Sequence, residues 1–447
     1  MNVLLVYASV ASRAHTGNEY SSGLGAIVSV TKQAGHQVRV LTVRQAGEYS
    51  ELLDQVKSFQ PRVVGFSVIS HQFRFVKEMA VRIKAQAPAT IIVCGGVHPT
   101  VYPEALLEKG AEAIDGFFVG EADFAFPEFL DRLEKGLSYR DTDNFAYAQN
   151  GTLVQNRLKP LIENLDVLPF PDKEMDSYRE TLMGRDGVAM IFCSRGCPFL
   201  CAYCSNHAIA KRYGIQHNSP RFRSPESCIR EIEAVIERYG QLVKTVFIGD
   251  EIFGANRRWR QEFCQAYKER INKPYRILLR VEMVKHDLLS MLKESGCSLI
   301  MFGVECGNEK FRFEVLNRPV SNEKIIRAFD LCHQYGLNTF AFNMIGLPGE
   351  TEEMIWETIQ LNRGIRPMIS IAAVFVPLRG TALGERCFRE GWIDDEAMLD
   401  FFEDSGETLL SFPEEHKQRL GYFYANCAML VNPNTPEATI QSKRGQS

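Results

Sequence analysis

The sequence predicts an α/β protein with an N-terminal doubly wound parallel sheet, followed by a partial (β/α)6 barrel of the TIM type and a small C-terminal helical region. Three observations predict it. Short apolar runs of strand length alternate with helical periodicity in two separate regions. A polar stretch that contains prolines divides the two regions. Four of the twelve cysteines crowd between Cys193 and Cys204, directly after the first strand of the second region.

Five strands and five helices are expected in the first 135 residues. The strands fall at 3–7, 38–43, 63–67, 90–94 and 113–119, and the helices at 23–34, 49–59, 73–85, 103–109 and 125–135. Strict alternation indicates parallel strands joined by right-handed crossovers. A ligand of such a sheet lies over the carboxyl ends of the strands.

Residues 136–186 are polar and irregular, and we interpret them as a linker with a small hairpin near 145–154. A second alternating region, the barrel, covers residues 187–380. The functional side chains of the barrel should follow the carboxyl ends of its strands. Residues 381–447 should be helical, with a polar tail from residue 432. The barrel strands are expected at 188–193, 245–249, 276–281, 299–303, 338–345 and 369–376.

Composition excludes several classes of protein. The 447 residues are 45% apolar and 24% charged, unlike a disordered, collagenous or coiled-coil chain. The 51 basic and 55 acidic residues give a net charge of −4, so we expect no nucleic-acid partner. No run of 18 apolar residues occurs, and no basic region precedes the first apolar stretch. We therefore expect no membrane span, no signal peptide and a cytoplasmic location.

Cys197, Cys201 and Cys204 have the spacing CxxxCxxC on one short loop. Three thiolates so placed can hold three irons of a cubane 4Fe-4S cluster, which leaves the fourth iron open to a substrate. A zinc site is the alternative. It would need a second CxxC or two histidines at conventional spacing, which are not found downstream. Cys193 could close such a site, but it should lie inside the preceding strand.

This loop, with Tyr203 before its last cysteine, resembles the signature of the radical S-adenosylmethionine (SAM) superfamily. The resemblance implies that SAM chelates the open iron through its amino and carboxylate groups. Reductive cleavage then yields methionine and a 5′-deoxyadenosyl radical, which requires a closed, mostly apolar barrel lumen. It also implies a reducing electron donor such as flavodoxin or ferredoxin.

Other segments resemble the SAM-binding parts of the superfamily at the expected strand ends. The implied contacts are with the methionine amino group and carboxylate, with the ribose and with the adenine. As alternatives, an acidic pair is often a solvated loop, a GxPGE segment a tight turn, and an acid such as Glu305 a helix cap. The implied residues are Gly249, Asp250 and Glu251 for the amino group, Arg280 for the carboxylate, Glu305 for the ribose, and Gly346, Pro348 and Gly349 for the adenine.

The first domain resembles the cobalamin-binding domain of a subgroup of these enzymes. Ser67, Gly95 and Gly96 match small residues that line the slot for the cobalamin nucleotide tail, and His98, Gly120 and Glu121 are also typical. The DxHxxG loop is missing, because Tyr20, Ser22 and Gly25 occupy its aligned positions. His15 lies upstream and out of register. Either cobalamin binds without this histidine, or the domain is a scaffold or lid.

The resemblance implies cobalamin-dependent C-methylation of an unactivated carbon. The alternative is a radical cyclisation, rearrangement, oxidation or C–C coupling, with a cobalamin domain that is non-methylating or empty. A methylthiotransferase would need three further cysteines, whereas the first domain has only Cys94. A metal-stabilised binding module would predict a zinc site. No catalytic side chain can be assigned, and the substrate is left open between a small metabolite, a lipid precursor and a peptide.

Overall fold

The computed structural model describes residues 1–10, 20–45, 47, 49–216, 219–393 and 406–432. Within these residues the first sheet has seven strands in the order β2-β1-β3-β4-β5-β6-β7. The first five are parallel, and the hairpin β6–β7 continues the sheet antiparallel. The strands are β1 (Asn2–Ala8), β2 (Gln37–Val43), β3 (Val63–Ser67), β4 (Ile91–Gly95), β5 (Gly116–Phe118), β6 (Phe145–Gln149) and β7 (Thr152–Gln155).

Helices cover both faces of this sheet, which is why its central strands are continuous apolar runs. Alternate residues of β1 pack in opposite directions. Leu5 packs with α1 (Ser22–Gln33) and α5 (Ala125–Glu134), whereas Leu4 packs with α2 (Ser50–Phe59) and α3 (Phe73–Gln86). The strand order reverses between β1 and β3, so the fold places its ligand crevice at the carboxyl ends of these strands.

Two local elements differ from the sequence-based expectation. The helix expected at 103–109 is a 3-10 turn (Pro103–Leu107), preceded by the short helix α4 (Val97–Val101). The strand expected at 188–193 ends at Ile191, because the next backbone N–H groups turn away. Those of Cys193 and Ser194 donate to Asp250 Oδ1 over 2.6 and 3.0 Å.

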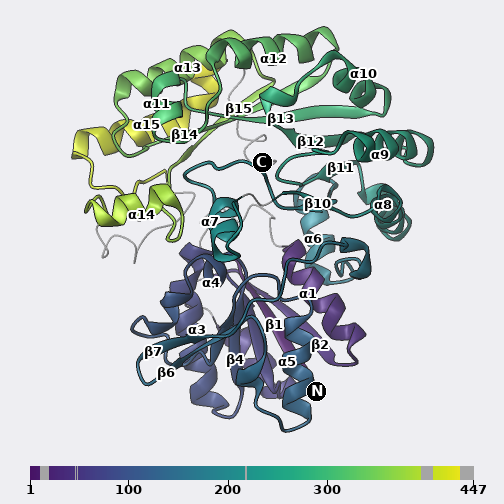
Figure 1. Cartoon of the computed structure of the whole chain (residues 1–447), viewed down its shortest axis with the longest axis vertical. Helices are drawn as coiled ribbons and strands as arrows, with labels where there is room; N and C mark the ends of the chain where they lie inside the picture. The colour runs from purple at the N-terminus through teal and green to yellow at the C-terminus, as the bar shows by residue number, and fades with distance from the viewer. Residues whose placement is uncertain (11–19, 46, 48, 217–218, 394–405, 433–447) are drawn as a thin grey trace.

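The second sheet is a curled half-barrel of six parallel strands among the described residues, in chain order from β8 to β15 (Figure 1). β8 and β15 are its two open edges. Its strands are β8 (Val188–Ile191), β11 (Thr245–Ile248), β12 (Tyr275–Leu279), β13 (Cys297–Glu305), β14 (Asn338–Ile345) and β15 (Ile369–Val374). Outside it lie α8 (Pro225–Tyr239), α9 (Arg257–Arg270), α10 (His286–Glu294), α12 (Asn322–Gln334) and α13 (Glu352–Ile365).

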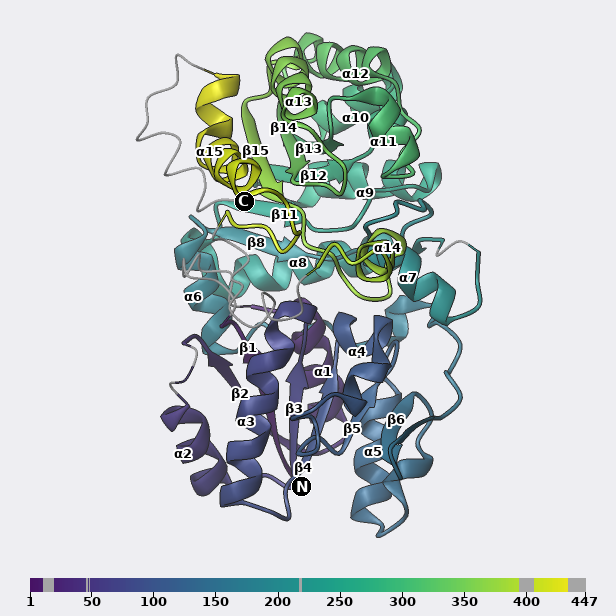
Figure 2. The ribbon, with the colours of Figure 1, turned by 90° about the vertical axis from the view of Figure 1, so that its left-hand side faces the viewer.

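The C-terminal region closes one edge of the half-barrel. Helix α15 (Glu414–Val431) lies beside β15, and its Leu420 and Phe423 pack with Ile345 and Val374 (Figure 2). Such a cover protects an edge strand from pairing with other chains. The shorter helix α14 (Ala382–Arg389) lies nearer the first domain. No helix among the described residues is both long and apolar enough to cross a membrane.

A buried charge cluster ties the segment between the sheets to the barrel. Lys173 and Arg223 both pair with Glu231 on α8, and all three side chains are at least 90% buried. Burial opposes ionisation, but the two cations lower the pKa of Glu231 below its usual value. The indole N–H of Trp259 donates to the carbonyl of Arg223 over 2.6 Å, which fixes the cluster against α9.

We expect Glu231→Gln to lower the free energy of unfolding by about 3–5 kcal/mol, because it leaves two buried cations unpaired. The matched control is Glu233→Gln on the same helix, which removes an exposed ion pair with Arg270 and should cost about 1 kcal/mol or less. Chemical denaturation of both variants checks this. Equal losses for the two would show that burial does not set the contribution of this cluster.

Candidate active site between the two domains

The cysteine loop connects β9 (Ser194–Arg195) to α7 (Ser205–Arg212) at the carboxyl end of β8. Cys201 is buried, and Cys197 and Cys204 are half-buried. Backbone N–H groups of Phe199 and Asn206 hydrogen-bond to the sulfurs of Cys197 and Cys204. Burial raises the pKa of Cys197 to about 11. Three thiols on one loop, two of them with amide hydrogen bonds, fit the requirements of a 4Fe-4S cluster with one open iron.

The zinc alternative requires ligands that converge on one ion. In the part of the chain that the structure describes, no three His, Cys, Asp or Glu side chains do so. A cubane instead places each thiolate on a separate iron. Cys193 lies fully buried behind the loop, beside Cys228. The assignment of Cys197, Cys201 and Cys204 as the cluster ligands stays a prediction.

Arg280 ends β12 and turns toward the cysteine loop. Its Nη1 lies 3.4 Å from Cys201 Sγ, and its guanidinium stacks 4.0 Å from the ring centroid of Phe199. Its other side pairs with Glu282 at 2.5 Å. Positive charge and N–H donors beside a thiolate stabilise the charged form of the cluster ligands. The predicted contact of Arg280 with the SAM carboxylate stays a prediction.

Tyr203 and Glu305 meet, although 102 residues separate them. The Tyr203 hydroxyl donates to Glu305 Oε1 over 3.0 Å. Glu305 has φ +69 at the bulge where β13 shifts register against β14, a conformation that is strained for a glutamate. Buried Arg318, which our sequence reasoning missed, contacts both side chains and donates to the carbonyl of Gly303. Together they hold the end of β13 against the cysteine loop.

Asp250 and Glu251, the two acids that follow β11, lie in different environments. Asp250 is fully buried and accepts from the backbone beyond β8, and burial raises its pKa to about 7. Glu251 instead projects into a cavity between the domains. Gly249 is required here, because a Cβ at this position would lie 2.9 Å from the Phe192 ring. Glu251 is thus the acid of this pair that can reach a ligand.

The turn after β14 is held together by hydrogen bonds to a glutamate at its end, Glu350. Gly346 and Gly349 have φ values of +72 and +83, and Pro348 between them is buried. The N–H groups of Gly346 and Leu347 donate to Glu350 Oε2 over 2.7 and 3.2 Å. Glu350 is 3% exposed, and burial raises its pKa to about 8. The predicted adenine contacts of this turn stay a prediction.

A cavity of about 260 Å³ opens at the carboxyl ends of β1, β3 and β4, and we call it the glycine-lined cavity. Glycines keep this cavity open. At Gly65, for example, a Cβ would lie 2.8 Å from the Leu5 side chain. This volume suits a heteroaromatic nucleotide tail and is too small for a whole corrin. Its lining includes Ser67, Gly95, Gly96, Gly120 and Glu121, five of the six residues predicted to contact cobalamin.

His98, the sixth of these residues, lines neither the glycine-lined cavity nor the cavity between the domains that Glu251 reaches. It is 5% exposed and packs against Phe73 at a ring distance of 4.7 Å. Its Nδ1 hydrogen-bonds to Ser70, and burial lowers its pKa to about 3. In the described part of the chain, no histidine lines either cavity. His15 lies outside the described residues, so its predicted place in the first loop stays untested.

An interdomain ion-pair network, which our sequence reasoning also missed, clamps the first domain to the barrel. Arg195, two residues before Cys197, forms a bidentate pair with Asp123 at 2.8 and 2.9 Å. Arg221 on β10 (Arg221–Phe222) forms another with Glu121 at 3.0 and 2.8 Å. Tyr213 binds the backbone N–H of Glu121 over 2.9 Å. The signal in the sequence was the pair of acids after Gly120, of which we assigned Glu121 to cobalamin and gave Asp123 no role.

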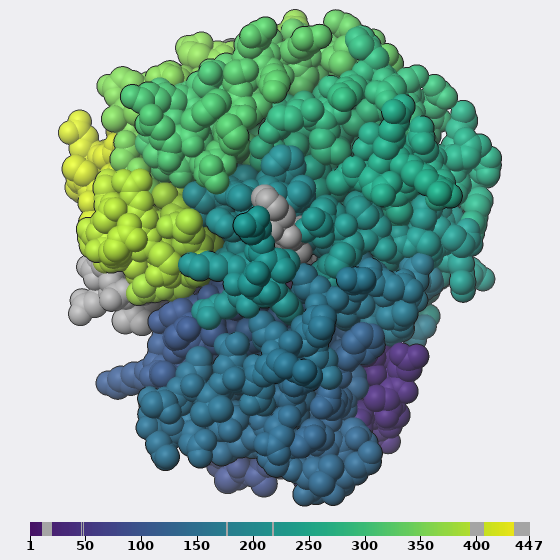
Figure 3. All heavy atoms as spheres, in the orientation of Figure 1, coloured from purple at the N-terminus to yellow at the C-terminus, as the bar shows by residue number. Residues whose placement is uncertain are grey.

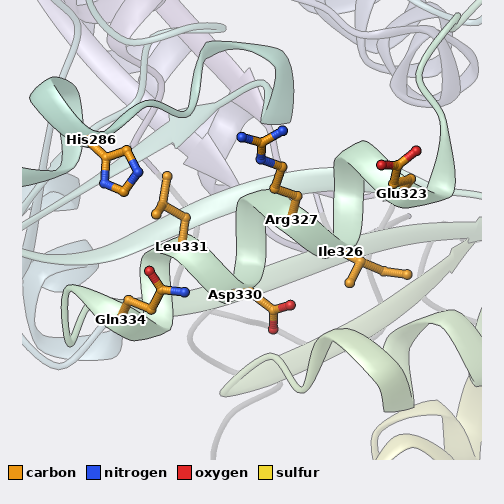
Figure 4. Close-up of a pocket in the computed structure, with 7 residues that line it drawn as sticks. All are labelled: His286, Glu323, Ile326, Arg327, Asp330, Leu331 and Gln334. Atoms are coloured by element: carbon orange, nitrogen blue, oxygen red, sulfur yellow. The ribbon is translucent and has the colours of Figure 1, made fainter.

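The second cavity, about 480 Å³, lies between the domains and is called the interdomain cavity. It shares Gly23, Asp123 and Arg195 with the glycine-lined cavity, and Glu251 also lines it. The two domains meet along a broad seam in the space-filling view (Figure 3). Another hollow lies on the outer surface at α12, with His286 near one end (Figure 4). It contains no predicted site residue.

Comparisons with known proteins agree with this geometry. Residues 191–361 match the model of the radical SAM superfamily, and residues 10–130 match that of the B12 binding domain. An uncharacterised methyltransferase of Pyrococcus horikoshii is 26% identical over 371 residues, 81% of this chain and 77% of the relative. An anaerobic magnesium-protoporphyrin IX monomethyl ester cyclase of Rubrivivax gelatinosus is 26% identical over 374 residues, 81% and 65% of the two chains.

A solved structure shows the same architecture. The radical SAM methyltransferase TsrM from Kitasatospora setae, with cobalamin and a [4Fe-4S] cluster bound, aligns with a TM-score of 0.70. The alignment covers 87% of this chain and 75% of that one, at 15% identity. The likeness at this identity concerns the fold, and it confirms the predicted pairing of a doubly wound domain with a partial barrel.

We expect Cys197→Ala, Cys201→Ala and Cys204→Ala each to lose most of the bound iron after anaerobic reconstitution, because each removes one thiolate of the cluster. Cys193→Ala is the matched control and should keep about four irons per chain. Iron and sulfide analysis with visible spectra checks this. Equal loss in Cys193→Ala, or zinc in place of iron, would contradict the open cluster.

The stability of the turn after β14 should fall as the pH rises from about 5 to 8. The pKa of Glu350 is about 8 in the folded chain, against a usual value of 4.5. In this window the unfolded chain releases a proton that the folded chain keeps, so the free energy of unfolding decreases. Glu350→Gln should therefore gain stability relative to wild type as the pH rises.

Denaturant titrations at pH 5.5, 7 and 8 measure this difference. The control is Glu353→Gln, an exposed residue in the first turn of α13, which should show no such trend. A constant difference in the free energy of unfolding between Glu350→Gln and wild type at all three pH values would contradict the predicted pH dependence.

Proposed function

The chain belongs to the radical SAM superfamily and carries a B12-binding domain, and on this premise we propose that it methylates an unactivated carbon of its substrate with the help of cobalamin. The observation that supports methyl transfer most directly is the continuity of the two cavities. They share Gly23, Asp123 and Arg195, so a group held at the strand ends of the first domain faces the chamber that Glu251 reaches.

The chain's own residues perform four tasks in this proposal. Cys197, Cys201 and Cys204 hold the cluster, while Glu251 offers a carboxylate to the SAM amino group. The glycine-lined cavity receives the nucleotide tail, and the interdomain network fixes the distance between the two cofactors. When bound, the cluster and SAM supply hydrogen abstraction, and cobalamin supplies the methyl group.

Apolar side chains line part of the interdomain cavity. Met190 and Phe192 line its barrel side, and Tyr20 and Leu165 line the other. A primary carbon radical requires an enclosure that keeps water away, and these side chains supply part of it. The reaction further needs a reductant, which we propose to be a flavodoxin or ferredoxin, and the substrate is a small molecule.

Radical chemistry without methyl transfer is the second candidate. It is supported by the cyclase relative, which aligns over as much of this chain as the methyltransferase relative does. The two candidates differ in their products. Methyl transfer consumes a second SAM and yields S-adenosylhomocysteine, whereas cyclisation yields 5′-deoxyadenosine without it.

We expect one 5′-deoxyadenosine and one S-adenosylhomocysteine per methylated product, and loss of the product when cobalamin is omitted. Reconstituted protein should contain about four irons and one cobalt per chain. Mass spectrometry of the reaction and metal analysis check both. Persistent 5′-deoxyadenosine without S-adenosylhomocysteine would favour the second candidate. Formation of 5′-deoxyadenosine by protein that binds no cobalt would indicate that the first domain is a scaffold.

A blocked-slot variant tests the role of the first domain separately. Gly95→Leu should fill the glycine-lined cavity, since the first added carbon meets only Phe118 at 3.8 Å. We expect loss of most bound cobalt with full iron content. Gly364→Leu is the control, because nothing lies within 4 Å of a Cβ there. Normal cobalt binding by Gly95→Leu would contradict the assignment of this cavity.

A further inference from the structure

In the described part of the chain, two neighbouring arginines, Arg185 and Arg276, have no acidic partner. Arg185 follows α6 (Asp176–Gly184), precedes β8 and lines the cavity. Arg276 is the second residue of β12. In the described part of the chain neither guanidinium is paired with a carboxylate, and Arg276 Nε is buried without a hydrogen-bond partner.

The strand register places Arg276 on the concave face of the half-barrel. Met190, Phe247 and Arg276 are aligned across β8, β11 and β12. Their neighbours Ala189, Val246 and Tyr275 belong instead to the core under the outer helices. Side chains alternate between the faces of a strand, so the aligned row points inward. The Arg276 guanidinium lies 5.9 Å from the Phe247 ring centroid, which agrees with this direction.

The electrostatic environment of these arginines differs from that of other arginines in the core of the molecule. Burial, and then the charge of Arg276, lower the pKa of Arg185 to about 10, so both stay cationic at neutral pH. By contrast, Arg223 pairs with Glu231 and Arg318 with Glu305. Two neighbouring uncompensated cations are unfavourable in a protein interior, and an arriving anion relieves that cost.

We propose that Arg185 and Arg276 bind an anionic group of the substrate: a phosphate, phosphonate or carboxylate. The apolar body of the substrate then lies along Met190 and Phe192 and extends toward Glu251. Arginine suits this role because its planar guanidinium donates two parallel hydrogen bonds to such groups.

This inference rests on the proposed function for the reacting end, but its test does not require turnover. The probe is 1-naphthyl phosphate, with neutral 1-naphthol as its matched control, added to the full cluster-reconstituted chain with and without cobalamin. Binding is measured by naphthyl fluorescence. We expect naphthyl phosphate to bind at least tenfold more tightly than naphthol, with or without cobalamin.

Arg185→Gln and Arg276→Gln should each weaken naphthyl phosphate binding about tenfold and leave naphthol binding unchanged. Arg185→Lys and Arg276→Lys should restore part of the affinity and serve where a glutamine variant fails to fold. The control is Arg258→Gln, whose side chain is 88% exposed on α9. Iron content should stay at the wild-type level in every variant, and Arg258→Gln should also keep wild-type formation of 5′-deoxyadenosine in the absence of substrate.

Three results would overturn the inference. The first is equal affinity for naphthyl phosphate and naphthol, and the second is unchanged affinity in the arginine variants. The third is loss of probe binding when cobalamin is loaded, which would assign the arginines to the cofactor's phosphate. A failure of methyl transfer with intact probe binding would instead contradict the proposed function and leave the anion site standing.

Discussion

The pairing of Arg195 with Asp123 is the interaction on which the rest of the site depends. Arg195 precedes the cysteine loop by one glycine, and Asp123 lies in the loop that follows β5 and lines both cavities. One bidentate ion pair therefore joins the cluster-binding loop to the ligand crevice of the first domain. Glu121, Arg221 and Tyr213 repeat the same connection a few ångströms away, so the two domains are held by geometry that tolerates little rotation.

Buried charge is treated in three different ways in this molecule. Lys173, Glu231 and Arg223 neutralise one another and fasten the segment between the sheets. Asp250 and Glu350 have pKa values raised by burial, and each accepts hydrogen bonds from backbone amides at a strand end. Arg185 and Arg276 have no carboxylate partner among the described residues. The first two arrangements hold backbone segments in place, whereas the third is the anion site that we propose.

Most strand and helix positions could be read from periodicity, because buried parallel strands are continuous apolar runs and their helices are amphipathic. The expected strand at 338–345 and helix at 257–270 coincide with β14 and α9. The differences occur where a tertiary contact competes with a local preference. β8 ends early because Asp250, more than 50 residues later, accepts hydrogen bonds from the backbone N–H groups of Cys193 and Ser194. Gly116 lets β6 approach β5, because a Cβ there would lie 2.6 Å from the carbonyl of Ala146, and nothing local to Gly116 predicts this.

By itself the sequence predicted the cluster ligands and determined that three thiols share one loop, since the CxxxCxxC spacing places them there whatever surrounds them. It also determined the two-sheet architecture and the small residues of the glycine-lined cavity, because these are local patterns. Only the tertiary structure decided which acid of the pair Asp250 and Glu251 faces a ligand, and that Glu121 serves the domain interface. It alone brought Arg185 and Arg276 close to each other. Such roles depend on which residues distant in sequence come into contact, and a contact of this kind leaves no periodic signal in the chain.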